Sequence, residues 1–346
     1  MNASRRLFFF LLYTFLWYSN CMKKIVTVGG GTGSYTVLSG LKYFSDIEIT
    51  ALVSMADDGG STGVLRDELG VLPPGDVRQC LIALSEHDAI LRKVMAYRFS
   101  EGTLAGHSFG NIFLAALEKV SGDFVQGVEI ASEILKVQGR VLPVTDNKAE
   151  LVVTLHDGQK LFGENLLNHA SVQEKGIAHI GFKGDVQLNA KAEKAILEAD
   201  CIVLGPGNYF CSLVPCLITK GFKEALQKTK AKIIFPVNLT NKQGHTMHWT
   251  VTEYVAHLEE FLGKDVDCVL INSEFPSEEQ VDYYEIEEGD GVLVLDDYEG
   301  TNAVRLPLLS HTLVTKDPSD TIASTRSFIR HSSRQIARAI IDIATK

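Results

Sequence analysis

The sequence lacks the patterns that mark several common protein classes. No two of its six cysteines are spaced as C-x-x-C, which excludes a zinc finger or a thioredoxin-type redox site. Lysine and arginine form no run long enough for a membrane-surface patch, and a net charge of −10 argues against nucleic-acid binding. No apolar run reaches the about 20 residues of a membrane-spanning helix. With no internal repeat and no low-complexity linker, the 346 residues have an ordinary globular composition.

The first 21 residues differ from the rest of the chain. Arg5 and Arg6 precede an apolar run at 7–18, as in a signal peptide, but the sequence before Cys21 is a poor cleavage site. We therefore expect residues 1–21 to be an upstream extension and Met22 to be the true start, with an export signal as the alternative. Several cysteines lie in apolar runs, where they behave as small buried hydrophobes. We expect reduced thiols in a reducing compartment.

From residue 24 onward, short apolar strands alternate with glycine-rich turns and helices. This alternation predicts βαβ units and a mostly parallel sheet covered by helices on both faces, a Rossmann-like three-layer αβα fold. We expect one domain over 22–346 with a small insertion at about 140–190, and a strand-rich last hundred residues. The predicted strands are 24–28, 47–55, two runs within 140–157 broken at 146–147, 201–204, 232–238 and 266–272. The predicted helices are a stretch after Gly33 through Leu41, 76–86, 88–99, 110–120, 125–136, 191–199, 212–228, 251–261 and 332–344.

Glycine-rich segments follow two of these strands. In an open parallel sheet, ligands bind outside the carboxyl ends of the strands. Glycine lets the backbone approach a phosphate closely, and the helix start that follows attracts its charge. The first segment lacks the Gly-Lys-Ser/Thr of a P-loop and has Thr36 where a dinucleotide fingerprint ends in Gly or Ala, so a plain tight turn is the alternative. The candidate phosphate-binding residues are Gly29, Gly30, Gly31, Thr32, Gly33, Gly205, Pro206, Gly207 and Asn208, with Asn238 at a third strand end as a weaker candidate.

An acidic segment follows the second predicted strand. Asp57 and Asp58 stand next to Gly59, Gly60 and Ser61. In dinucleotide-binding folds an acidic residue at about this distance from the first glycines meets a ribose hydroxyl. The two carboxylates are also suited to Mg²⁺, which commonly takes one or two carboxylates together with ligand phosphates. A helix cap with a polar turn is the structural alternative.

Two further patterns suggest other chemistry. Residues 106–110 match G-x-S-x-G, the nucleophile elbow of serine hydrolases, but the residues before the serine do not form the strand that this motif requires. We therefore keep His107 and Asn111 only as polar ligand contacts at a helix start. His245 and His248 are three residues apart without a carboxylate partner, and we interpret them as non-metal residues.

Seven segments of the chain together resemble one family. In order, they are 29–33, 56–61, 72–80 with Asp76 and Arg78, 106–111, 139–143, 204–207 and Arg330-His331. With these segments the chain is similar, from residue 24 to its C-terminus, to the bacterial gluconeogenesis-factor (YvcK-like) family, relatives of 2-phospho-L-lactate transferase (CofD). The resemblance implies a Rossmann-like fold, a cytoplasmic location, a UDP-sugar ligand such as UDP-N-acetylglucosamine, and a role in cell shape and envelope precursor supply during gluconeogenic growth.

The chain departs from the family pattern at two places. Cys211 replaces a threonine and is a poor hydrogen-bond donor. Residues 238–246 lose the proline and glutamate of the family and gain Lys242, a charge suited to phosphate. These changes affect the expected identity of the ligand.

Two functions therefore stay open. The first is a nucleotide-sugar-binding regulator without turnover. The second is a Mg²⁺-dependent transferase acting on a nucleoside diphosphate ester, in which Asp57 and Asp58 are catalytic and hold the metal, as the transferase relatives imply. An NAD(P) dehydrogenase rests only on the Rossmann-like start. We expect Mg²⁺ as the one candidate cofactor, no nucleic-acid partner and no membrane insertion, and we leave a homo-oligomer and a regulatory protein partner open.

Overall fold

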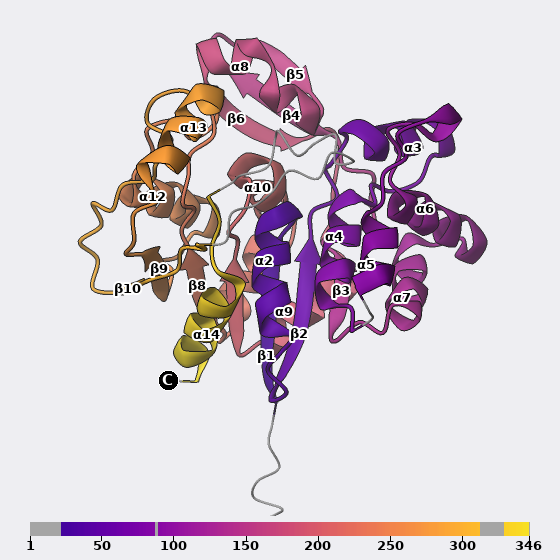
Figure 1. Cartoon of the computed structure of the whole chain (residues 1–346), viewed down its shortest axis with the longest axis horizontal. Coiled ribbons are helices and arrows are strands. Elements are labelled where there is room, and N and C mark those ends of the chain that lie inside the picture. Colours follow the sequence, from indigo (N-terminus) through magenta and orange to yellow (C-terminus); the bar gives the residue numbers. More distant parts are fainter. Residues whose placement is uncertain (1–21, 87–88, 312–328, 346) are drawn as a thin grey trace, which may run out of the picture.

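A parallel seven-stranded sheet forms the centre of the protein (Figure 1). The structure is a computed structural model that describes residues 22–86, 89–311 and 329–345, so the expectations for residues 1–21 lie outside the described residues. The strand order is β10-β9-β8-β7-β1-β2-β3, with every neighbouring pair parallel. The strands are β1 Lys23–Gly29, β2 Ile47–Val53, β3 Arg140–Pro143, β7 Cys201–Leu204, β8 Lys232–Pro236, β9 Cys268–Asn272 and β10 Ala303–Leu306.

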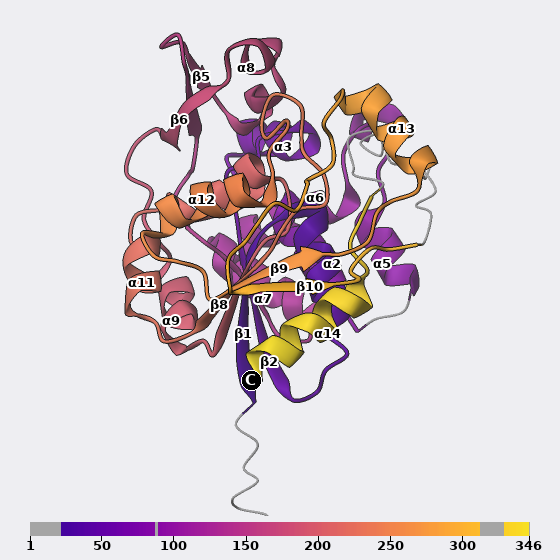
Figure 2. The same cartoon turned by 90° about the vertical axis from the view of Figure 1, so that its left-hand side faces the viewer.

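Helices cover both faces of this sheet, which explains why its strands are apolar without alternation. In β1, Val26 and Val28 pack into one hydrophobic core and Ile25 packs into the other. Figure 2 shows the two helix layers on either side of the strands, and the fold is the predicted αβα sandwich. One layer contains α2 Gly31–Leu41, α4 Gly75–Leu84, α5 Ala89–Ala96, α6 Phe109–Ser121, α7 Phe124–Ile134 and α14 Ser333–Ala344, and the other contains α9 Ala190–Glu198, α10 Val214–Leu217, α11 Phe222–Lys228 and α12 Val251–Leu262.

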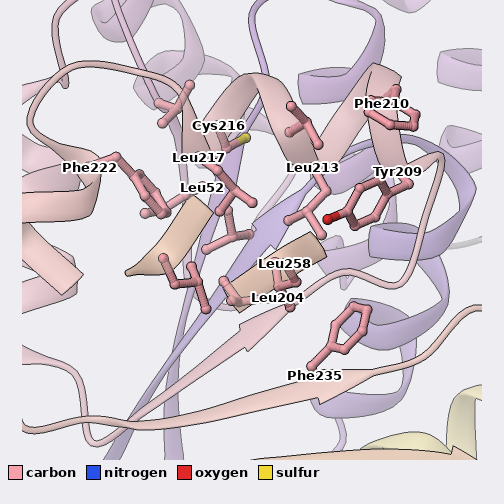
Figure 3. Close-up of a cluster of buried hydrophobic side chains, with 14 of the residues drawn as sticks. Leu52, Leu204, Tyr209, Phe210, Leu213, Cys216, Leu217, Phe222, Phe235 and Leu258 are labelled. Atoms are coloured by element: carbon pink, nitrogen blue, oxygen red, sulfur yellow. The ribbon is translucent and has the colours of Figure 1, made fainter. Parts of the chain in front are cut away.

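Aromatic packing holds the loop that follows β7. Tyr209 and Phe210 are buried, and their rings lie 5.2 Å apart in an edge-on arrangement. Trp249 packs against Tyr209 at 5.7 Å. Figure 3 shows the Tyr209 and Phe210 rings within the core that also contains Leu204 and Phe235 of the sheet. Large buried aromatic side chains contribute strongly to a core, so the backbone just before Tyr209 is held firmly.

A second, antiparallel sheet stands beyond the carboxyl ends of the central strands (Figure 1). It falls within the stretch 140–190. We call it, with its two short helices, the small sheet unit. Its strands lie in the order β5-β4-β6, and its elements are β4 Leu151–Leu155, β5 Lys160–Phe162, the 3-10 helix η2 Glu164–Asn168, α8 Ala170–Lys175 and β6 Ile177–Phe182.

The structure corrects two sequence predictions and adds one helix. The helix expected at 212–228 is a π-helix η3, Tyr209–Leu213, followed by α10 and α11. α10 ends at Leu217, and Gly221, in a left-handed conformation at φ 97°, is the N-cap residue from which α11 starts. The added helix is α3, Gly60–Leu69, which begins after the Asp57-Asp58 pair, where a helix cap was the structural alternative. In the described part of the last hundred residues, helices α12 and α13 (Glu278–Glu288) outweigh strands β9 and β10.

The described cysteines are free and buried, as expected for reduced thiols. They are Cys80, Cys201, Cys211, Cys216 and Cys268. Across the described ranges, we find no helix with the length and apolar content needed to cross a membrane.

Candidate functional site

The two glycine-rich loops meet where the direction of strand connection changes. β1 leads through α2 to β2 on one side, while β7 pairs with β1 on the other side. A Cβ atom added to Gly33 would lie 2.0 Å from the Pro206 carbonyl oxygen and 2.7 Å from the Gly207 Cα. The loops are therefore in direct backbone contact, which a larger residue at position 33 would prevent. Such a switch point is the usual ligand crevice of a doubly wound sheet.

A third strand end is tied to the same place. Asn238, after β8, accepts a hydrogen bond from the Gly207 amide through Oδ1 at 3.2 Å and donates from Nδ2 to the Gly207 carbonyl at 2.8 Å. A cleft of ≈ 320 Å³ opens between these loops. Of the residues predicted from sequence, the cleft is lined by Gly31, Thr32, Gly33, Asp76, Pro206, Gly207, Asn208 and Asn238.

Two helices begin at this cleft. α2 begins at Gly31, so the amides of Thr32 and Gly33 belong to a first turn whose N–H groups have no acceptor within the helix. η3 begins at Tyr209, and the Asn208 side chain caps it by accepting from the Cys211 amide at 3.3 Å. Helix N-termini carry partial positive charge and bind anions such as phosphate. The cleft can therefore receive a phosphate group in spite of the negative net charge of the chain.

Three carboxylic acids gather beside the first loop. Burial, helped by the charge of Asp57, raises the pKa of Asp76 to about 7. Burial also raises the pKa of Asp57, and burial together with the charge of Asp57 raises the pKa of Glu164 to about 8. Glu164 comes from η2 of the small sheet unit. It was not predicted, because no local signal connects a helix-start glutamate with a loop more than a hundred residues away.

Asp58 holds the small sheet unit instead of facing the cleft. Its Oδ1 accepts from the Asn165 amide at 2.7 Å, and its Oδ2 accepts from the Glu164 amide at 3.1 Å. Arg66 lies 3.7 Å from the same carboxylate. A Cβ at Gly163 would lie 2.2 Å from Asp58 Oδ2, so this docking needs glycine there. The two adjacent aspartates of the sequence thus have different surroundings.

Four further predicted residues form a polar network behind the acids. Arg78 is buried and donates from Nε to Asn111 Oδ1 at 2.8 Å. The Asn111 side chain donates from Nδ2 to Ser61 Oγ at 3.4 Å, and Ser61 Oγ lies 3.2 Å from His107 Nδ1. These contacts join α3, α4 and α6, and none of the four side chains lines the cleft of the described residues. The charge of Arg78 acts on Asp57 and Asp76, so this network stabilises the acidic residues from outside the cleft.

The G-x-S-x-G segment is not a nucleophile elbow. A 3-10 helix, Gly102–Leu104, precedes it instead of a strand, and Ser108 is the N-cap residue of α6. A Cβ at Gly110 would lie 2.5 Å from Arg78 Cδ, so this glycine makes room for the arginine. The prediction that no strand precedes Ser108 is confirmed.

The other predicted glycines shape the site without lining it. A Cβ at Gly30 would lie 1.9 Å from Asp76 Oδ2, and the Gly31 amide donates to the same carboxylate. The Gly59 amide donates to Asp57 Oδ1 at 3.0 Å. Neighbouring positions that also stay outside the cleft lining are Gly29, Gly60 and Gly205.

The half of the cleft away from the glycine loops comes from the loop after β8, from α13 and from the segment before α14. Lys242 lies there and forms an ion pair with Glu288 at 2.5 Å. His245 and His331 also line this half and are buried. The sequence singled out Lys242 and the Arg330-His331 pair, but it carried no signal for Glu288, which only the folding of α13 brings here.

Comparison with known proteins identifies the family to which the chain belongs. The model of the family 2-phospho-L-lactate transferase CofD matches residues 25–314. A Thermotoga maritima protein named "Putative gluconeogenesis factor" is 40% identical over 92% of this chain and 98% of its own. The Bacillus subtilis "Gluconeogenesis factor" is 34% identical over 92% of this chain and 98% of its own. The crystal structure of a UPF0052 family member from Bacillus halodurans superposes with a TM-score of 0.82 at 31% identity, covering 92% of this chain and 99% of that chain.

The chain therefore belongs to the CofD family and is related over most of its length to proteins named gluconeogenesis factors.

Proposed function

We propose that the protein binds a nucleoside diphosphate sugar of the UDP-sugar type in the cleft between the β1, β7 and β8 loops. The observation that carries this proposal is the interlocking of Gly33 with Pro206 and Gly207, which brings two helix starts to one cleft. Main-chain amides at two helix starts match the two phosphates of such a ligand. The second half of the cleft then has room for the part of the ligand beyond the diphosphate.

Binding without turnover is the first form of the proposal. The Cys211 thiol is buried, and burial raises its pKa well above the ordinary value, which makes it a poor nucleophile. The Ser61–His107 pair stands outside the cleft lining. In keeping with its relatives' names, we propose a cytoplasmic regulator needed for cell shape and envelope precursor supply during gluconeogenic growth.

The alternative is a Mg²⁺-dependent transferase acting on a nucleoside diphosphate ester. The match to the transferase family model and the acids beside Gly31 favour it. Within the described ranges, no three His, Cys, Asp or Glu side chains are placed to hold a metal ion. Mg²⁺ bound to phosphates needs only one or two carboxylates. Asp76 lines the cleft and lies close enough to Asp57 for their charges to interact, so these two residues would hold the ion. Bound there, the ion would neutralise phosphate charge. Asp58 accepts hydrogen bonds from two main-chain amides of the small sheet unit, so its role would be to hold that unit in position.

Isothermal titration of the full chain tests the first form. We expect heat of binding with UDP-N-acetylglucosamine, because the amides and the second half of the cleft are both used. Absence of heat at millimolar concentration, while GDP binds, would contradict the proposal. Parallel titrations with and without Mg²⁺ and an assay for released nucleoside monophosphate separate binding from transfer: release in the presence of Mg²⁺ would establish the alternative.

A further inference from the structure

The chain places one of its own carboxylates on hydrogen-bond donors of the cleft. Glu288, the last residue of α13, accepts from the Lys242 ammonium at 2.5 Å through Oε1 and from the Gln243 amide at 3.1 Å through Oε2. Glu288 and Lys242 line the cleft, with 14% and 33% of their side chains exposed. An ammonium beside a main-chain N–H is a donor set suited to a phosphate or a carboxylate. Glu288 therefore occupies a place where an anionic group of a ligand can bind.

The loop side of this contact is fixed to the core. The Lys242 amide donates to Thr246 Oγ1 at 3.1 Å, and the Thr246 amide donates back to the Lys242 carbonyl at 3.0 Å. Thr246 Oγ1 also accepts from the Tyr254 hydroxyl at 2.9 Å, and both Thr246 and Tyr254 are buried. Buried polar networks of this kind rigidify their surroundings. The backbone that presents the two donors is therefore held in place whether or not Glu288 occupies them.

The α13 side of the contact is packed less tightly. Figures 1 and 2 show this helix beyond the carboxyl ends of the central strands. Among its described side chains, Tyr284 alone is buried, whereas Ile286 is 84% exposed. The neighbours of Tyr284 in its small hydrophobic cluster are Val292, Leu309 and Ile329. Because most helical stability in proteins comes from packing of an apolar face, α13 is the partner that can be displaced.

Flexible positions follow α13 directly. Gly289 and Gly291 have left-handed conformations, at φ 87° and φ 81°. Just beyond them the chain is anchored again, because the Val292 carbonyl accepts from the main-chain amide of Asn241 at 2.6 Å. Hinges are a few residues that absorb large changes of φ and ψ, and glycine does so at low cost. The two glycines can therefore let the helix move while the chain after it stays in place.

The charge of α13 opposes an anionic ligand. Residues 278–290 contain seven acidic residues and no lysine or arginine. The carboxyl end of a helix also carries a partial negative charge, and Glu288 places that end of α13 at the cleft. In this arrangement α13 repels a phosphate group and neutralises Lys242, the cation that would attract it.

We propose that α13 is an autoinhibitory lid, in which Glu288 occupies the donors of Lys242 and Gln243 until an anionic group of the ligand displaces it. This inference rests on the proposed function and adds the regulation of the same site. On binding, the phosphate takes over both donors, the Glu288 carboxylate passes into solvent, and α13 moves away from the cleft. The contact that must be broken lowers the apparent affinity, as in any equilibrium between a closed and a competent state.

Titration of the full chain with UDP-N-acetylglucosamine compares wild type with Glu288→Gln. Glutamine keeps the size of the side chain and removes its charge. We expect about three- to ten-fold tighter binding, between the effect of a surface ion pair and that of a hydrogen bond to a charged group. Glu285→Gln is the matched control, since it removes the same charge one turn earlier, at a position outside the cleft lining of the described residues. Its affinity should stay within about two-fold of wild type, the scale of a surface charge.

Lys242→Met and the double variant test the pair itself. We expect Lys242→Met to bind more weakly than wild type, because a phosphate contact is lost. In that background Glu288→Gln should have little further effect, since the partner that it releases is gone. Amide hydrogen exchange reports the movement: a helix of this length is marginal without packing, so ligand should speed exchange across 278–288. Glu288→Gln should show part of this increase without ligand.

Three results would overturn the lid and leave the proposed function intact. They are unchanged or weaker binding by Glu288→Gln, equal tightening by Glu285→Gln, and slower exchange in α13 when the ligand binds. Binding by Glu288→Gln but not by wild type would support both the lid and the proposed function. Absence of binding in wild type and Glu288→Gln alike would overturn both.

Discussion

At the level of single residues, several glycines of this site leave space for neighbouring groups that the chain brings there from elsewhere. Gly33 admits the backbone of Pro206, and Gly30 admits the Asp76 carboxylate. A Cβ at Gly75 would lie 2.4 Å from Asp57 Oδ2. Because these contacts involve backbone or buried acids, the neighbours have little freedom to move away. Glycine is thus needed at these positions because other parts of the chain pack closely against them, and not only because of the proposed ligand.

A single methyl group at position 33 is expected to separate the two loops. Gly33→Ala should lower the free energy of unfolding by about 1–3 kcal/mol, as overpacking does, and should abolish detectable nucleotide binding. Urea unfolding and titration calorimetry measure the two effects. Gly181→Ala is the control, since a Cβ there finds its nearest neighbour at 3.5 Å, an ordinary contact. Wild-type affinity in Gly33→Ala would show that the loops do not need this contact.

At the level of elements, the small sheet unit is joined to the central domain next to the acidic residues. Asp58 receives the first two amides of η2, and Glu164 of the same helix adds its carboxyl group to the acids. The unit therefore helps to build the site, and any movement of η2 would move Glu164.

Removal of the Asp58 carboxylate should loosen this junction. Asp58→Ala leaves two main-chain amides without their acceptor, and we expect a loss of about 2 kcal/mol, the scale of hydrogen bonds to a charged group. Amide hydrogen exchange should become faster at residues 164 and 165 and through the small sheet. Asp58→Asn, which keeps one acceptor oxygen, should have a smaller effect. Asp185→Ala, on an exposed ion pair of the surface, is the control, and equal exchange in Asp58→Ala and wild type would refute the role of Asp58.

At the level of the whole molecule, the acidic residues make stability depend on pH. The pKa of Asp76 rises from 3.8 to about 7 and that of Glu164 from 4.5 to about 8. The folded protein therefore binds more protons than the unfolded chain between these values, and its stability falls as pH increases. The stabilising contribution is complete below about pH 4 and is lost by about pH 8.

Glu164→Gln removes one of these titrations. We expect the free energy of unfolding of this variant to fall less between pH 5 and pH 8.5 than that of wild type, because glutamine stays neutral. Urea midpoints at both pH values measure the difference. Glu174→Gln, at an exposed position of α8 in the same unit, should follow wild type. Identical pH slopes for Glu164→Gln and wild type would contradict the assignment.

The regular elements were predictable from the sequence where their pattern is local. The strands β1 and β2 and the helices α6 and α14 appear within a few residues of their predicted bounds, because apolar runs and helical periodicity depend only on nearby residues. The break at Gly221 and the helix α13 were missed. The first depends on one left-handed glycine, and the second has no apolar face for periodicity to reveal.

The sequence by itself determined the parallel αβα architecture and the two glycine-rich turns, because strand burial and turn geometry follow from residues that are neighbours along the chain. Only the tertiary structure decided that Asp76 and Glu164 join Asp57 while Asp58 binds the small sheet unit. It also decided that His245 and His331 line one cleft. These relations join residues far apart in sequence, and the burial that shifts their pKa values exists only once the layers have packed.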